Sequence, residues 1–302
     1  DVCSSDLTGD SAVFRLNAPT ASTTLRIFNI PCICKVTDGS GDLLYRADNN
    51  DTPDDTSDDI YIPAIYGMIK DAFAAVNSGA LYTKSGSGAG STYTPFSSTS
   101  YQIQMLCDYE VPTSDVVEAV AGHTLVFTTA STNASDGYSF RSTRPSGTSG
   151  EATYMPSGDN RALLTRATGN TKAFITIEGN TSTTTTFTMS DLVIVGHNAA
   201  LDPGIKGGAL DADHTTVTID HCDIKHFSAD DGGAVYTSGD SLTITDSKFE
   251  SCESKNYTSN NGGGAVQSMA LNVRVEDSQF ISCTAMDQGG GLYQKLDSSD
   301  YE

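Results

Sequence analysis

The sequence predicts an all-β fold: a right-handed parallel β-helix, or solenoid, with an N-terminal capping α-helix and a small preceding β segment. Two observations predict this fold class. Self-similar copies recur between residues 187 and 294, and a Gly-Gly step follows each of them. In addition, only 18% of the residues are charged, while small polar residues are abundant. Such a composition favours many short strands joined by small-residue turns.

The N-terminal part of the chain contains two predicted segments. Residues 1–7 match the translation, in one reading frame, of a common short-read sequencing adapter. We therefore expect that they come from adapter sequence joined to an assembled environmental gene fragment, and we base no fold prediction on them. Residues 8–59 are predicted to form a short β segment and an acidic linker, because apolar and polar residues alternate and residues 38–42 have hairpin-turn composition. The acidic stretch 48–59 lacks the central Gly and terminal Glu of an EF-hand loop, so calcium there is only an alternative to a solvated loop.

Residues 60–302 are predicted to form the β-helix, which begins with its capping helix at about residues 63–78. Helical spacing is followed by Ile65, Ile69, Ala72, Phe73 and Val76. Pro63 suits the first turn of this helix and Gly79 suits its end. The helix would cover the open end of the apolar column. Strands are predicted at residues 101–106, 124–127, 174–177 and 187–189, with a long polar loop at 131–160.

The repeat copies are predicted to be stacked coils. They start at residues 187, 217, 242 and 273, and this variable spacing favours a solenoid, whose coils absorb insertions in outward loops. The alignment stacks three groups: Val217, Leu242 and Val273; Ile224, Phe249 and Phe280; Phe227, Cys252 and Cys283. Only stacked coils can bury these inward residues. The Gly-Gly steps at 207, 232, 263 and 290 are predicted to let neighbouring coils approach closely.

The cysteines leave two alternatives open. Once Cys3 is set aside with the adapter segment, six cysteines remain, and none of them shows the Cys-x-x-Cys spacing of a zinc site. Cys222, Cys252 and Cys283 recur with the repeats. They form either an inward column of small apolar thiols or, for Cys252 and Cys283, a disulfide.

The repeats resemble the polymorphic outer-membrane-protein repeat, whose hallmarks are Gly-Gly-Ala followed by Ile, Leu or Val, and Phe-x-x-Asn. Gly-Gly-Ala starts at Gly207, Gly232 and Gly263, whereas the Phe-x-x motif ends at Cys252 and Cys283 instead of Asn. This departure puts any binding role of the Asn in doubt, but not the fold. The helix and first strands also look like the opening of pectate-lyase-like β-helices. The chain is similar to large repeat-bearing, adhesin-like surface proteins of gut bacteria.

The charge balance argues against two classes of partner. Lys and Arg number 17 against 38 Asp and Glu, which gives a formal net charge of −21. Nucleic acid and anionic membrane surfaces would repel such a chain, so neither is a predicted partner. No apolar run is long enough to span a bilayer, so no membrane insertion is predicted within this fragment.

Candidate catalytic and metal-binding side chains occur on the repeats. A polysaccharide lyase would need clustered carboxylates for calcium and a Lys or Arg base. The acids are Asp220, Asp223, Asp246, Glu250, Glu276 and Asp277, and the bases are Lys225, Lys248 and Arg274. For a metal, the sequence offers His197, His214, His221 and His226, with Asp230 and Asp231. We interpret these residues as solvated or structural, so no catalytic, cofactor-binding or metal residue is predicted. The glycosylation sequons at Asn133, Asn180 and Asn256 are interpreted as chance matches.

The expected function is therefore not enzymatic. We expect a fragment of a secreted or cell-surface protein with a structural or adhesive role, whose loops bind a host surface or a glycan. The alternative is a carbohydrate-active enzyme, either a polysaccharide lyase or a glycoside hydrolase, on a pectate-lyase-like β-helix, because fold alone does not determine function.

Overall fold

The computed structural model describes residues 32–48, 60–87, 90–113, 117–118, 122–143, 155, 158–179, 182–255 and 262–296. The described chain is an all-β protein with a single helix, as predicted. Its largest sheet has eight strands, in the order β24 (Asn272–Glu276), β20 (Ser241–Thr245), β16 (Thr215–Asp220), β13 (Thr185–Ser190), β10 (Thr124–Thr129), β7 (Ser100–Met105), β1 (Cys34–Asp38) and β4 (Ile65–Tyr66). We call this the first sheet.

Two six-stranded parallel sheets accompany the first. The second sheet consists of β25 (Gln279–Ile281), β21 (Lys248–Glu250), β17 (Asp223–Lys225), β14 (Leu192–Val195), β11 (Ala162–Arg166) and β8 (Tyr109–Val111). The third consists of β27 (Leu292–Gln294), β23 (Val266–Ser268), β19 (Val235–Thr237), β15 (Leu210–Asp213), β12 (Ile175–Glu178) and β9 (Val117–Glu118). A small parallel sheet adds β18 (Ser228–Ala229), β22 (Glu253–Ser254) and β26 (Thr284–Ala285).

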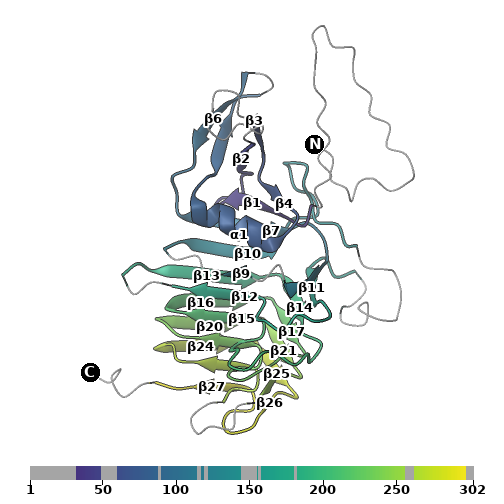
Figure 1. The fold of residues 1–302 in the computed structure, drawn as a ribbon, viewed down its shortest axis with the longest axis vertical. Helices are drawn as coiled ribbons and strands as arrows, with labels where there is room; N and C mark the ends of the chain where they lie inside the picture. Colours follow the sequence, from purple (N-terminus) through teal and green to yellow (C-terminus); the bar gives the residue numbers. More distant parts are fainter. Residues whose placement is uncertain are drawn as a thin grey trace.

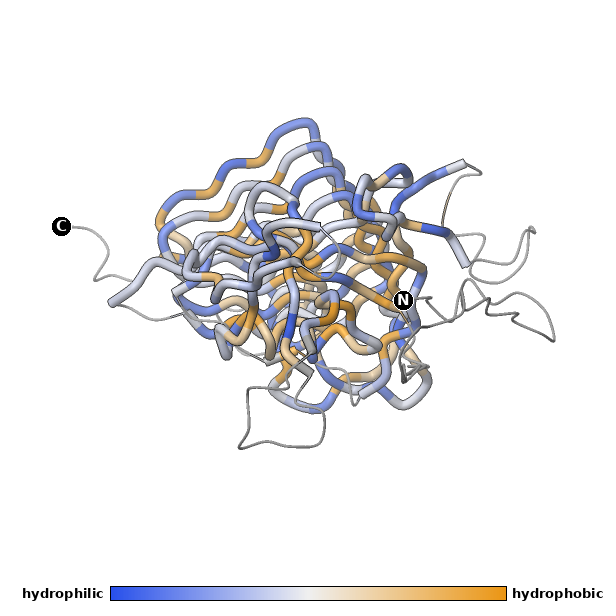
Figure 2. The backbone as a smooth tube through the Cα atoms, turned by 90° about the horizontal axis from the view of Figure 1, so that it is seen from above, coloured by the Kyte–Doolittle hydropathy of each residue, from blue (hydrophilic) through white to orange (hydrophobic). Residues whose placement is uncertain are grey.

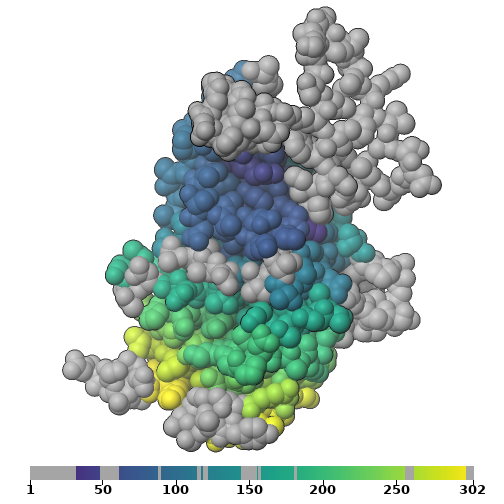
Figure 3. All heavy atoms as spheres, viewed as in Figure 1, coloured from purple at the N-terminus to yellow at the C-terminus, as the bar shows by residue number. Residues whose placement is uncertain are grey.

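From β7 onward the chain visits these sheets in a fixed order. One circuit takes a strand in the first sheet, then one in the second and then one in the third, and the next circuit repeats the order. Each strand pairs in parallel with its counterpart one circuit later, so the circuits form a stack (Figure 1). Figure 3 shows the same circuits as successive layers on the surface, from blue near the helix to yellow at β27.

The strand register confirms the repeat alignment. Val217 pairs with Leu242, and Leu242 with Val273, in the first sheet. In the second sheet, the column runs from Ile224 through Phe249 to Phe280. The third sheet stacks Leu210, Val235, Val266 and Leu292. The last Gly step is therefore Gly289 to Gly291, one residue earlier than the sequence alignment placed it.

The core is a set of apolar columns inside the stack. Strand β16 alternates buried and half-buried residues along its whole length, as do β13 and β7. Figure 2, which looks along the stack, shows apolar and polar residues alternating along stretches of the stacked backbone. Phe187, Ile219 and Phe249 are at most 1% exposed. Burying each such side chain contributes about 1.5–3 kcal/mol, which gives each circuit a stabilising contact with the next.

Helix α1 (Ile69–Ser78) lies at one end of the stack (Figure 1). It ends at Gly79, as predicted, and Gly79 adopts the left-handed conformation. The ring of Phe73 packs edge-on against Phe127 of β10, with ring centroids 5.9 Å apart. The helix thus covers the first circuits. It is the sole helix in the described ranges. With ten residues, it is too short to cross a bilayer.

The helix begins at Ile69 and not near Pro63 as predicted. Pro63 is the last residue of β3 (Ile60–Pro63), and Ile65 lies in β4. The Ala64 N–H donates to Leu44 O at 2.9 Å, and the Ala64 carbonyl accepts from the Val36 N–H, also at 2.9 Å. Because these backbone groups already pair with strands, the chain enters the helix only after Met68. The helical spacing of Ile65 with later residues was therefore misleading.

The N-terminal strands are not a separate unit. The predicted hairpin turn forms, with Asp38 Oδ1 accepting from the Ser40 and Asp42 N–H groups. Strand β1 then pairs antiparallel with β7 of the first circuit. Strand β2 (Tyr45–Asp48) joins an antiparallel sheet with β3, β5 (Tyr82–Ser85) and β6 (Thr92–Pro95). The predicted boundary at residue 59 therefore falls between two paired strands.

Part of the predicted loop at 131–160 is anchored to the fold. Lys35 is 1% exposed, and its Nζ lies 2.6 Å from Asp136 Oδ2 and 2.9 Å from the Tyr138 carbonyl. Several sequence predictions lie outside the described residues: the adapter segment 1–7, the acidic stretch 49–59, and the sequons at Asn180 and Asn256.

Candidate functional site

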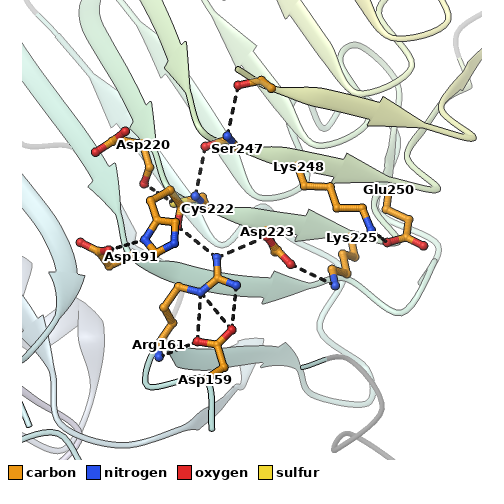
Figure 4. A network of polar contacts seen from close by, with 12 residues as sticks. Asp159, Arg161, Asp191, Asp220, Cys222, Asp223, Lys225, Ser247, Lys248 and Glu250 are labelled. Carbon is orange, nitrogen blue, oxygen red and sulfur yellow. Dashed lines mark hydrogen bonds and ion pairs between the residues drawn. The ribbon is translucent and has the colours of Figure 1, made fainter. Parts of the chain in front are cut away.

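Four of the nine predicted acids and bases lie together on the outer face of the second sheet. On neighbouring strands β17 and β21, Asp223 pairs with Lys248 and Lys225 with Glu250 in register, so opposite charges face each other. Lys225 Nζ lies 3.2 Å from Asp223 Oδ2, and Lys248 Nζ lies 2.7 Å from Glu250 Oε2 (Figure 4). Arg161, just before β11, bridges Asp223 and Asp159. The charges are thus paired with one another.

Asp246 and Asp277 occupy a bend of the backbone. They follow β20 and β24 and have φ angles of 45° and 46°. His221 and Asp191 occupy the same place in earlier circuits, with φ angles of 49° and 52°. Few residues other than glycine tolerate this left-handed region, and aspartate is one of them. The recurrence of acids here therefore follows from backbone geometry.

The remaining predicted acids are also engaged. Asp220 Oδ1 accepts a hydrogen bond from Thr245 Oγ1 at 2.6 Å. Glu276 Oε1 lies 2.7 Å from Arg274 Nη2 on the outermost described circuit.

The histidines do not converge on one point. His221 Nδ1 lies 2.6 Å from Asp191 Oδ1, whereas His214 lies at the other end of β16, about 20 Å away along the strand. His197 is exposed. Burial lowers the pKa of His226. Across the described residues, no group of three His, Cys, Asp or Glu side chains could hold a metal ion.

A polar groove lies where the chain passes from the third sheet to the first. We call it the corner groove, and its volume is about 270 Å³. It is lined by Ser182, Thr183, Thr184, Thr185, His214, Thr216, Gly239 and Asp240. Of the residues proposed from sequence, His214 is the one that lines it. The hydroxyl groups along its wall can both donate and accept hydrogen bonds.

Next to this groove lies a cluster on the outer face of β15, which we call the β15 face: Lys206, Asp211, Asp213 and Tyr236. Lys206 Nζ lies 4.3 Å from the centre of the Tyr236 ring. Ser238 connects the cluster to the corner groove, because its Oγ donates to Asp213 Oδ1 at 2.8 Å and accepts from the His214 N–H at 3.1 Å.

Asp211 has the most unusual environment of this cluster. Its pKa is raised to about 7, chiefly by burial and also by the neighbouring Asp213, while Lys206 acts in the opposite direction. Its Oδ1 is buried without a hydrogen-bond partner. A carboxyl that holds its proton near neutral pH can donate a hydrogen bond or a proton. A perturbed acid in such a cluster is a physical indication of a functional site.

Sequence reasoning missed the β15 face, although a signal for it was present. Asp211 and Asp213 stand two residues apart, directly after the Gly207-Gly208-Ala209 step. On a strand, residues at this spacing point to the same side, and the apolar Leu210 and Ala212 between them point inward. Two carboxyls on one outward face are therefore predictable, but the burial of Asp211 is not.

Replacing Asp211 by asparagine is expected to stabilise the fold above neutral pH. Because the folded-state pKa of about 7 exceeds the ordinary value of 3.8, the folded chain binds this proton more tightly than the unfolded chain does. Stability is therefore lost as the pH rises from about 4 to 7. Asp211→Asn should raise the free energy of unfolding by about 3 kcal/mol at about pH 8, and by little at about pH 4.

Urea unfolding of the wild type and of the variant at both pH values measures this difference. Asp240→Asn removes the same charge from an exposed position and should change the free energy of unfolding by less than about 0.5 kcal/mol. An Asp211→Asn gain that is the same at both pH values would contradict the titration of this carboxyl.

Comparison of the chain with protein-family models, with curated proteins and with solved structures gives no match. The candidate site therefore rests on the geometry of the corner groove and the β15 face.

Proposed function

We propose that the stacked circuits form a right-handed parallel β-helix and that the chain is part of a secreted or cell-surface repeat protein. Its role is structural and adhesive. It acts as a binding module and not as an enzyme, and its outer surface binds a glycan. The right-handed sense is expected from a general rule, because the crossover connection between two parallel strands of one sheet is right-handed in nearly all proteins. The order of the sheets along the chain supports a solenoid.

The observation that carries the binding role is the hydroxyl-lined corner groove beside the β15 face. Seven of its eight lining residues have a polar side chain, five of them serine or threonine. A sugar presents several hydroxyl groups, each of which can pair with such side chains. The net charge of −21 disfavours acidic polysaccharides, so the ligand is a neutral oligosaccharide. On the second sheet, by contrast, the charged residues pair among themselves.

Calorimetric titration with a panel of neutral oligosaccharides tests this role. Thr216→Val removes a hydroxyl from the groove at nearly constant shape, and binding should weaken about tenfold, as expected for one lost hydrogen bond. Thr218→Val is the matched control, because Thr218 lies two residues further along β16, on the same face but outside the groove. Equal affinities of both variants and the wild type would refute the assignment of the groove.

A carbohydrate-active enzyme is the second candidate, and Asp211 is the observation that favours it. Glycoside hydrolases use two carboxyls, one of which holds a proton near neutral pH. Asp211 and Asp213 lie about 7 Å apart along β15. Incubation with neutral and acidic polysaccharides, with and without calcium, distinguishes the candidates through new reducing ends and unsaturated product. Turnover that Asp211→Asn abolishes would replace the adhesive role with this one.

A further inference from the structure

Two cysteines lie side by side on the last two described circuits. Strand β22 pairs with β26 so that Glu253 faces Thr284, which places the preceding residues, Cys252 and Cys283, next to each other. The Thr284 N–H donates to the Cys252 carbonyl at 2.9 Å. Neighbouring strands in a sheet are about 4.8 Å apart, a separation at which two cysteines can form a disulfide. Both thiols are free in the structure.

The two thiols differ in their access to solvent. Cys252 is fully buried, whereas Cys283 is partly exposed because β26 is the edge strand of its sheet among the described strands. The thiols share a hydrogen bond, which lowers the pKa of Cys283 to about 7 and raises that of Cys252. A thiol with a pKa near the ambient pH is an effective attacking group in disulfide exchange. Cys283 is thus suited to react first and Cys252 to react second.

We propose that Cys252 and Cys283 are a site of thiol–disulfide exchange, at which a small-molecule disulfide closes a bond between the two circuits. The Cys283 thiolate attacks one sulfur of a disulfide such as oxidised glutathione, forming a mixed disulfide and releasing one thiolate. Cys252 then attacks Cys283 Sγ, loses its proton and releases the second thiol. The protein loses two hydrogens and the small disulfide gains them, so the exchange balances.

This bond would hold the edge circuit against the one before it. On this last described circuit, Val275, Ile281 and Met286 are more than a third exposed. A disulfide persists in the oxidising surroundings of secreted proteins. The inference goes beyond the proposed glycan binding and does not depend on it, because the thiols lie in a different part of the circuit from the corner groove.

The full chain, incubated in a series of reduced and oxidised glutathione mixtures and then alkylated, tests the proposal. Intact mass and peptide mapping of the wild type should find a Cys252–Cys283 bond under oxidising conditions. The melting temperature should rise by several degrees on oxidation and return on reduction. Cys283→Ser should lose both effects. Cys222→Ser is the matched control, since Ser247 and not a cysteine stacks on Cys222, and it should keep both.

Two results would overturn the proposal. One is alkylation of both thiols in the wild type at every glutathione ratio. The other is a mixed disulfide with glutathione that persists on Cys283 without transfer to Cys252. Because mapping is done on the wild type, neither result depends on a variant that folds poorly. Loss of glycan binding alone would leave this proposal untouched.

Discussion

Replacing Phe249 by alanine is expected to destabilise the fold by about 4 kcal/mol. Phe249 is fully buried on β21, with Ile224 before it and Phe280 after it in the same column. Its ring stacks on that of Phe280, with ring centroids 5.0 Å apart. Alanine would leave a cavity between two circuits whose spacing is fixed by backbone hydrogen bonds, so the site can collapse only partly.

Urea unfolding followed by circular dichroism measures this loss. Phe280→Ala is the matched control, because Phe280 stacks on Phe249 in the same column but lies half-buried on the last described circuit. We expect it to cost less than half as much, since the edge site leaves no closed cavity. Equal losses in the two variants would mean that the outermost described circuit is as tightly packed as the one before it.

The stacking of these circuits could be predicted from sequence because the packing positions repeat. A slip of one residue in β20 would turn Leu242 and Ile244 outward and bring Thr243 into the core. Only one register therefore buries the apolar residues of every copy, and that register is visible in the alignment. The length of the inserts between copies does not affect it, since those residues lie outside the columns.

The parts that could not be predicted depend on partners far apart in the sequence. Arg166, at the end of β11, is 4% exposed, and its Nη2 donates to the Gly208 carbonyl at 3.0 Å. Its guanidinium also lies over the ring of Phe174, 4.6 Å from the centroid. Its Nη1 also donates to the Asn170 carbonyl of the same circuit at 3.1 Å, whereas Gly208 belongs to the next circuit. The sequence gives no sign of this burial, because part of what satisfies the charge comes from another circuit.

The candidate site also has one part that could be predicted from the sequence and one part that could not. The alternation of Asp211 and Asp213 with Leu210 and Ala212 indicates an outward pair of carboxyls. Burial is the main cause of the raised pKa of Asp211, and the charge of Asp231, which lies on the next circuit, raises it as well. The spacing of residues in the sequence predicts which side chains share a face of one strand. A site on stacked strands, however, consists of residues from several strands, whose contacts the spacing does not predict.

Replacing Gly233 by alanine is expected to destabilise the fold by about 3 kcal/mol or more, which tests the role of the Gly-Gly step directly. A Cβ atom at Gly233 would lie 2.3 Å from the Gly264 carbonyl oxygen and 2.5 Å from that of Glu253. Both oxygens belong to the backbone of the next circuit, so neither can move aside without separating the circuits. The alignment of Gly-Gly-Ala steps thus reflects close approach of backbones.

Gly90→Ala is the matched control, because nothing lies within 4 Å of a Cβ at Gly90 and its φ is not in the left-handed region. It should change the free energy of unfolding by less than about 0.5 kcal/mol. Denaturant midpoints of the two variants and the wild type measure the difference. If Gly233→Ala unfolds at the wild-type midpoint, the circuits can separate at this step without loss, and glycine there is not required by packing. A large loss in Gly233→Ala alone would mean that the Gly-Gly step sets the distance between circuits, and with it the contact that buries Phe249.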